Sequence, residues 1–151
     1  MKENLANSYE ELKRAEHLIF VSLKYTRTVD VLKSVIDRLI ATYDYAMISL
    51  LKYYKAKKKI DAIPDSPVAK ALKLKDMGYD AFLHDSMDFY LLMRKISKAD
   101  FTRAREFRRH VTMTVIIDGG AVEINIDKVE EYFDKTRAFL AHVKGLVVSE
   151  K

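Results

Sequence analysis

Apolar residues recur in steps of three and four over most of the chain, which is the spacing of side chains on one face of an α-helix. The pattern is strongest after Thr28, a plausible N-cap residue, and continues to about Lys59. This segment predicts a long bundle helix, roughly 45 Å at 1.5 Å per residue, packed by knobs into holes. Its inward seam comprises Val29, Leu32, Ile36, Leu39, Tyr43, Ala46, Leu50 and Tyr53, widened by Val35, Ile40, Met47 and Tyr54.

Three further helices are predicted around this one. Ser8-Tyr-Glu-Glu11 has the form of a capping box and predicts a helix from there to about Arg27. Within it, residues 18–21 are apolar on every side, which indicates either a centrally buried turn or a second apolar neighbour such as another subunit. Ser66 and Pro67 predict the start of a short helix that Gly78 closes. Another helix is expected over residues 80–98, with an inward face of Phe82, Phe89, Leu92, Met93 and Ile96.

The period changes from helical to alternating after His110. Val111, Met113, Val115 and Ile117 alternate with Thr112, Thr114 and Ile116, and apolar and polar residues alternate again from Val122 to Ile126. Asp118-Gly119-Gly120 between the two segments can form a tight turn. A last amphipathic helix then follows, capped by Asp127 with Glu130 and ending before Gly145; its inward face is Val129, Tyr132, Phe133, Phe139, Leu140 and Val143. We therefore predict a mainly α, single-domain fold over residues 1–151: a four- to five-helix up-and-down bundle with one β-hairpin between the last two helical segments.

Composition excludes several classes of chemistry. The chain has no cysteine, so thiol catalysis and cysteine-bound metal centres are absent. It also lacks a glycine-rich nucleotide loop and a serine nucleophile elbow. Neither a signal-peptide core at the N-terminus nor an apolar run near the ~20 residues of a membrane span is present. We expect a cytoplasmic protein with no membrane partner.

Positive charge is concentrated in one window. From Arg94 to His110 there are seven Lys and Arg residues against two acidic residues, a local net charge of +5, equal to that of the whole chain. Because the rest of the chain is balanced, this window is the best candidate for contact with an anionic partner.

The basic window also contains residues suited to acid–base chemistry on RNA. A neutral histidine such as His110 can accept the proton of a 2′-hydroxyl, while Arg105 and Arg103 can stabilise the charge that develops at phosphorus. Arg108, Arg109 and Lys98 are candidate contacts to RNA phosphates. If the segment is helical, Arg103, Glu106 and His110 share one face. Glu106 then either orients the imidazole or pairs with an arginine.

Two metal-like patterns are better explained by exposed polar residues. Asp80, His84 and Asp88 lie at ligand-like spacing on one helix face, but no inward carboxylates from other helices complete a bundle metal site. Asp30, Asp37 and Asp44 recur every seven residues, as expected for a solvated helix flank. We predict no metal site and no cofactor.

The segment Arg105-Glu-Phe-Arg-Arg-His110 resembles the signature of the HEPN superfamily, an arginine followed by a polar residue and, four to six residues after the arginine, a histidine. Arg103 to His110 also fits with six intervening residues. The resemblance extends to the helical architecture around the motif. A second spacing match, Arg137 to His142, has no polar residue after its arginine and lies in an inward-patterned helix.

Membership of this superfamily implies a homodimer that brings two motifs together and, in many members, a metal-independent endoribonuclease. It also implies frequent pairing with a nucleotidyltransferase-like antitoxin. Two alternatives stay open: a non-catalytic protein that binds nucleic acid or nucleotides, and a scaffold that binds a protein partner. In the scaffold alternative, residues 103–109 are a solvated basic helix end docked to the core by Phe101 and Phe107. His110 lies either at the end of a helix or at the start of the strand.

Overall fold

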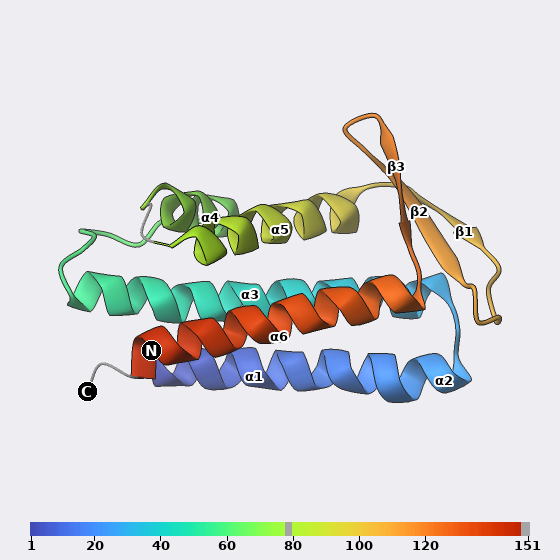
Figure 1. Ribbon diagram of the computed structural model, residues 1–151, viewed down its shortest axis with the longest axis horizontal. Helices are drawn as coiled ribbons and strands as arrows, with labels where there is room; N and C mark the ends of the chain where they lie inside the picture. The colour runs from blue at the N-terminus through green and yellow to red at the C-terminus, as the bar shows by residue number, and fades with distance from the viewer. Residues whose placement is uncertain (78–79, 149–151) are drawn as a thin grey trace.

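The computed structural model describes residues 1–77 and 80–148. Within these ranges four long helices lie side by side, and a small sheet is attached at one end of the bundle (Figure 1). The long helices are α1 (Lys2–His17), α3 (Val29–Ala56), α5 (Ala81–Lys98) and α6 (Ile126–Val148), and the short helix α4 (Pro67–Asp76) packs against α5. The predicted mainly α bundle with an inserted hairpin is confirmed. No described helix is long and apolar enough to cross a membrane.

Helix α1 begins at Lys2, so the predicted capping box at Ser8 is wrong. Ser8 and Glu11 lie within the helix and face α3, where the Ser8 hydroxyl donates to the carbonyl of Thr42 at 2.7 Å. Glu11 is buried and accepts from Arg14 at 2.6 Å and from Arg38 at 2.9 Å. The spacing of a capping box is also the spacing of neighbours on one helix face, and here tertiary contacts use both side chains.

The first helix continues through a π-helical turn, η1 (Leu18–Ser22), into α2 (Leu23–Tyr25). Of the apolar segment 18–21, Ile19 is buried, whereas Phe20 and Val21 are exposed. Tyr25, one turn further along, is 83% exposed. A centrally buried turn is therefore the wrong interpretation for this segment, which presents apolar side chains at the surface.

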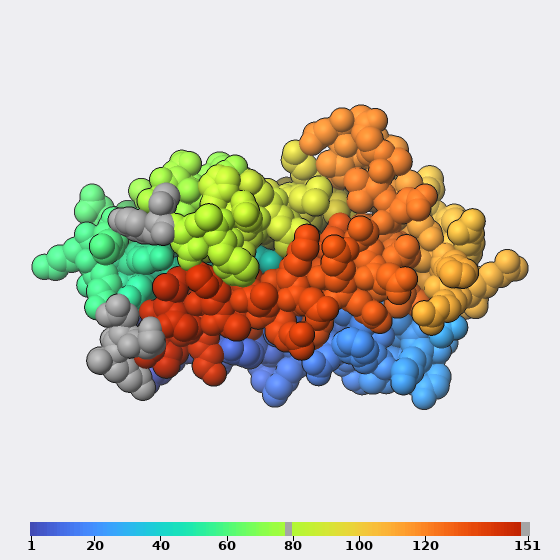
Figure 2. All heavy atoms as spheres, in the orientation of Figure 1, coloured from blue at the N-terminus to red at the C-terminus, as the bar shows by residue number. Residues whose placement is uncertain are grey.

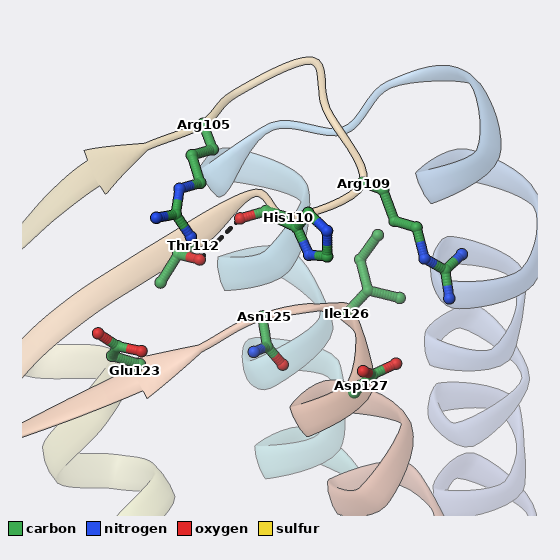
Figure 3. Close-up of a pocket in the computed structure, with 8 residues that line it drawn as sticks. All are labelled: Arg105, Arg109, His110, Thr112, Glu123, Asn125, Ile126 and Asp127. Atoms are coloured by element: carbon green, nitrogen blue, oxygen red, sulfur yellow. Dashed lines mark hydrogen bonds between the residues drawn. The ribbon is translucent and has the colours of Figure 1, made fainter.

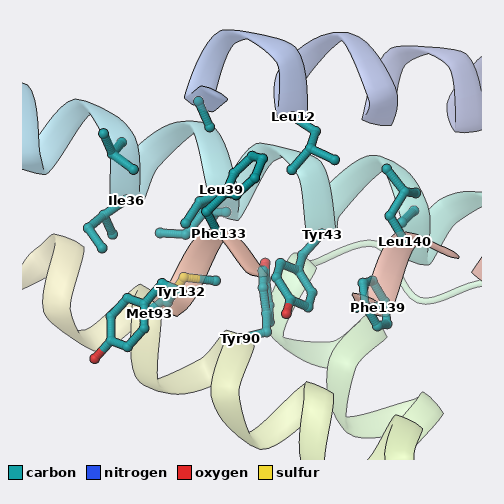
Figure 4. Close-up of a cluster of buried hydrophobic side chains, with 14 of the residues drawn as sticks. Leu12, Ile36, Leu39, Tyr43, Tyr90, Met93, Tyr132, Phe133, Phe139 and Leu140 are labelled. Carbon is teal, nitrogen blue, oxygen red and sulfur yellow. The ribbon is translucent and has the colours of Figure 1, made fainter. Parts of the chain in front are cut away.

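Helix α3 follows the sequence prediction closely. Thr28 is its N-cap, accepting from the Val31 amide at 3.3 Å. The helix ends at Ala56, three residues before the predicted end. Its seam is buried, except that Tyr53 is only partly covered. The Tyr43 ring stacks on Phe139 of α6, with ring centroids 4.4 Å apart, at the centre of the core in Figure 4. Aromatic side chains thus join the long helix to the last one.

The carboxylates on the flank of α3 are engaged in tertiary contacts, so the predicted solvated row is wrong in detail. Asp37 accepts from Ser97 of α5 at 2.7 Å. Asp44 accepts from the Tyr90 hydroxyl, also of α5. These contacts attach α5 to α3 in register.

The predicted start of α4 and most of α5 are confirmed. Ser66 accepts from the Ala69 amide at 3.0 Å, with Pro67 as the first residue of α4, whereas the predicted closing Gly78 lies outside the described residues. Helix α5 is capped by Asp80. Its predicted inward face is correct at Met93 and Ile96, partly correct at Phe89 and Leu92, and wrong at Phe82, which is 41% exposed. Leu83 points into the core in its place.

The hairpin is present, with a third strand added to it. Strands β2 (Thr112–Ile117) and β3 (Gly120–Ile124) flank a turn in which Asp118 and Gly119 adopt positive φ angles of 51° and 83°. Strand β1 (Phe101–Ala104) pairs antiparallel with β2, with Phe101 opposite Val115. Its residues carry no apolar alternation, because β1 is an edge strand whose last three residues are exposed.

Helix α6 begins at Ile126, two residues earlier than the predicted cap at Asp127 implies. Asn125 accepts from the Lys128 amide at 2.8 Å, so Asn125 takes the capping role assigned to Asp127 and Glu130. The predicted inward face is buried throughout. The helix continues past Gly145 to Val148, because no turn residue with positive φ interrupts it there.

Candidate nucleic-acid interface

Residues 105–110 form a turn between β1 and β2 rather than a helix. Arg105 and Phe107 have positive φ angles of 56° and 65°, a conformation that is uncommon for side chains of this size. The predicted shared helix face of Arg103, Glu106 and His110 therefore does not form, and His110 lies just before the second strand. This turn, called the 105–110 loop below, protrudes at the end of the molecule in the space-filling view (Figure 2).

Two hydrogen bonds fix the 105–110 loop to the start of α3. The Glu106 carboxylate accepts from the Val29 amide at 3.1 Å, and the Phe107 amide donates to the Arg27 carbonyl at 2.6 Å. The first of these contacts places a negative charge at the positive end of the helix dipole. Glu106 therefore anchors the loop on the bundle. Its one other contact among the described residues is with Arg103, so it does not orient His110.

A small cavity of about 110 Å³ lies beneath the loop. In Figure 3 the His110 imidazole points towards Asn125 and Ile126, and the Arg105 guanidinium lies beside Thr112. Arg109 extends away on the opposite side of His110. The Thr112 hydroxyl donates to the His110 carbonyl at 2.8 Å, which fixes the end of the loop. The cavity is lined by Arg105, Arg109, His110, Thr112, Glu123, Asn125, Ile126 and Asp127.

The predicted site residues separate into three groups. Arg105, Arg109 and His110 line the cavity together. Arg108 is exposed on the same loop without lining the cavity. Arg103 and Lys98 lie apart from it: Arg103 is on β1, and Lys98 ends α5 beside Ile116 and Asp118.

The cations differ in whether they are neutralised. Arg103 pairs with Asp30 at 2.9 Å and lies 3.7 Å from the Glu106 carboxylate, and its hydrogen bond to Asp30 raises the pKa of the guanidinium. Arg105, Arg108 and Arg109 are exposed and form no ion pair with any residue in ranges 1–77 and 80–148. The loop thus presents three free guanidinium groups, whereas Arg103 belongs to the fold.

Thr112, Glu123, Asn125 and Asp127 are cavity residues that sequence reasoning did not select. The alternating hairpin pattern contained a signal for three of them. In the observed register Thr114 faces Glu123 and Met113 faces Ile124, so the polar positions of both strands form one face. Thr112, Glu123 and Asn125 occupy such positions and meet the loop at its base. Asp127 is brought in by the start of α6.

Asp80, His84 and Asp88, which have ligand-like spacing in the sequence, do not lie together as one group. Asp80 caps α5 and bonds to His142 of α6. His84 instead lies near the exposed Asp85 and Asp88, with nitrogen–oxygen separations of 3.5 and 3.7 Å. The Lys75 ammonium binds Asp88 at 2.6 Å and supplies the positive charge there. His142, in the second spacing match, is likewise engaged by a carboxylate.

Comparison of the chain with protein-family models, with curated proteins and with solved structures finds no match in any of the three.

Proposed function

We propose that this protein binds single-stranded RNA, with the guanidinium groups of Arg105, Arg108 and Arg109 contacting successive phosphates. The observation that carries the proposal is the concentration of three exposed, unpaired arginines on one anchored loop. Arginine binds phosphate oxygens through two parallel hydrogen bonds, and the binding strengthens when the group is held in place beforehand. A cavity of about 110 Å³ lies well below the ~300 Å³ and above typical of small-molecule pockets. Its size therefore suits a phosphate-sized group better than a whole organic ligand.

The test is the salt dependence of RNA affinity. Three phosphate contacts on a single strand give a slope of log K against log salt of about −2, at about −0.7 per contact. Fluorescence anisotropy with a labelled single-stranded oligonucleotide, titrated at several salt concentrations, measures this slope. We expect the triple variant R105A/R108A/R109A to lose both the affinity and most of the slope.

A matched control removes the same charge from the other end of the bundle. Lys2, Lys52 and Lys73 are exposed residues of α1, α3 and α4, and their replacement lowers the net charge equally. The variant K2A/K52A/K73A should bind RNA as the wild type does. Equal losses in the two triple variants would show that only total charge matters, and would refute a site on the 105–110 loop.

Cleavage of the bound RNA is a second candidate function, favoured by the presence of Arg105 and His110 on one cavity. In this mechanism His110 takes the proton from a 2′-hydroxyl, whose oxygen then attacks the adjacent phosphorus. The bond from phosphorus to the 5′-oxygen of the next nucleotide breaks, and that oxygen leaves as a 5′-hydroxyl after taking a proton from water, while the other product is a 2′,3′-cyclic phosphate. Arg105 stabilises the additional negative charge on the phosphate oxygens. No metal is needed, as in the HEPN ribonucleases that the motif resembles.

The ribonuclease proposal is tested by incubating mixed single-stranded RNA with protein in EDTA. We expect cleavage by the wild type, and none by His110→Ala or Arg105→Ala. An exposed histidine elsewhere provides the matched control, because His17→Ala leaves the loop unchanged. Cleavage that persists in His110→Ala would identify a contaminating nuclease and refute the mechanism.

We carry two further expectations of the HEPN resemblance as proposals. The exposed side chains of Phe20, Val21 and Tyr25 support a homodimer surface along η1 and α2. Analytical ultracentrifugation of wild type and Phe20→Glu would detect such a dimer and its loss. Pairing with a nucleotidyltransferase-like antitoxin predicts that such a protein co-purifies when both are expressed together.

A further inference from the structure

The most exposed apolar side chain of the basic window is Phe107, at 75% exposure. It lies between the three free arginines in sequence, with Arg105 before it and Arg108 and Arg109 after it. The expectation that Phe101 and Phe107 both dock this segment to the core is wrong for Phe107. Phe101 is partly buried, with the Arg103 guanidinium 5.1 Å from its ring centroid, whereas Phe107 projects from the loop.

The exposed Phe107 side chain lies on an unusual backbone conformation. Its φ angle of 65° is one that bulky residues rarely adopt. Its amide is held by the Arg27 carbonyl at 2.6 Å, and the preceding Glu106 is held by the Val29 amide. Both contacts hold the chain just before the Phe107 Cα atom, and they stabilise the turn from which the ring projects. Outlying backbone conformations of this kind concentrate at binding sites.

We propose that the Phe107 ring stacks on a nucleobase of the single-stranded RNA whose phosphates contact the arginines of the loop; this inference rests on the proposed function. Every base presents a flat π face, so one aromatic side chain beside a cationic surface binds single strands without selecting a sequence. Phe107 is three residues from His110, a span of at most about 11 Å along the chain. A short segment of RNA can therefore contact the ring and the cavity together.

A membrane surface fits the loop less well than a single strand of RNA. Membrane-binding segments bury a broad apolar face beneath a charged one. Within residues 105–110, Phe107 is the single apolar side chain, and the other five are charged or polar. An isolated ring surrounded by guanidinium groups matches an alternation of bases and phosphates.

The experiment compares Phe107→Ala, Phe107→Leu and Phe107→Tyr in anisotropy titrations against a labelled single-stranded RNA. Loss of one base stack should weaken binding by about 5- to 150-fold in the Ala variant. Leu keeps apolar bulk but lacks the π face, and should lose most of the affinity. Tyr keeps the ring and should stay within about threefold of the wild type. The salt slope should not change in any of them, because no phosphate contact is removed.

Three readouts separate failure of the inference from failure of the proposed function. The wild type should bind an abasic strand with the same number of phosphates only as tightly as Phe107→Ala binds the RNA. If the wild type and Phe107→Ala bind RNA equally tightly, the stacking proposal alone is overturned. If the wild type binds no RNA, the stacking proposal and the proposed function are both overturned. Sedimentation with phosphatidylserine vesicles tests a membrane surface as the alternative partner. If Phe107 is required for binding to vesicles but not for binding to RNA, the inference is also overturned. Phe82→Ala, which removes another exposed phenylalanine from the far end of α5, is the control.

Discussion

Replacement of Glu106 tests how the loop is attached to the bundle. Its carboxylate accepts from the Val29 amide at 3.1 Å, at the first residue of α3, and lies 3.7 Å from a guanidinium nitrogen of Arg103. Glu106→Ala removes the acceptor, the charge and the ion pair together. Glu106→Gln removes the charge but retains an oxygen in the same place. The pair of variants therefore distinguishes a hydrogen bond to the helix start from general electrostatic attraction.

The cost of Glu106→Ala follows from three contributions. An acceptor at a helix N-terminus contributes typically about 1 kcal/mol. A negative charge at the positive end of the helix contributes about 0.3–1 kcal/mol. The Arg103 pair is 42% exposed on the arginine side and 26% on the glutamate side, which limits it to well under about 1 kcal/mol. We expect a total loss near 2 kcal/mol for Ala and under about 1 kcal/mol for Gln.

Urea unfolding monitored by circular dichroism measures both losses, and thermal unfolding should show a decrease of about 4–8 °C for the Ala variant. Glu131→Ala is the matched control, because Glu131 is exposed on α6 and its ion pair among residues 1–77 and 80–148 is with Lys128. It should change stability by less than about 0.5 kcal/mol. Equal stability of Glu106→Ala and Glu131→Ala would refute the assignment of Glu106 as the anchor of the loop.

Four further predictions concern the scaffold. Phe139 is fully buried against the long helix, so Phe139→Ala should cost about 3–5 kcal/mol in urea unfolding. Burial raises the pKa of the Asp80 carboxyl, but hydrogen bonds from His142 and the α5 backbone outweigh burial and leave the pKa below its ordinary value. The stability that this shift contributes is fully present when the pH lies above the ordinary carboxyl pKa. It is lost as the pH falls through the lowered pKa of Asp80. Asp80→Asn should therefore be less stable than wild type at pH 7, and the gap should close in urea titrations near pH 2. Gly119 has φ of +83°, so Gly119→Ala should cost about 1–2 kcal/mol. Gly145 lies within α6, and a Cβ atom added there would meet no atom of the described residues within 4 Å, its own helical turn aside. Gly145→Ala should therefore stabilise the protein by up to about 1 kcal/mol, measured by thermal unfolding.

The helices could be predicted because burial of one helix face makes apolar residues recur with the period of the helix. The seam of α3 and the inward face of α6 were correct at nearly every position, since each helix has one apolar stripe against the core. The errors occur where a polar residue has two competing uses. Ser8 and Glu11 match a capping box but bind α3, and Asp127 matches a cap that Asn125 supplies. Local spacing cannot show which tertiary partner is within reach.

The candidate site was predicted by charge but not by geometry. Charge concentration selected the segment that forms the loop, and three of the six selected residues line one cavity. The helical placement of Arg103, Glu106 and His110 was wrong, because strand β1 is recognisable only through its pairing with β2. An edge strand of exposed residues has no apolar alternation to reveal it. The division between free and neutralised arginines likewise depends on Asp30, which is distant in sequence and adjacent in space.

The backbone at Phe107 provides a final test of whether the ring serves the fold or a partner. A left-handed conformation costs a side-chain-bearing residue about 1–2 kcal/mol, and glycine avoids this cost while losing about 0.5–1 kcal/mol through greater freedom in the unfolded chain. At an ordinary packed position Phe→Gly would cost several kcal/mol. At φ 65° with 75% of its surface exposed, Phe107→Gly should be at least as stable as the wild type and yet bind RNA as weakly as Phe107→Ala. Stability and affinity changing in opposite directions would show that a conformation unfavourable for folding is retained for binding. If the free energy of unfolding of Phe107→Gly is lower than that of the wild type by more than about 1 kcal/mol, the ring supports the fold. That result would remove the argument for a base-stacking role.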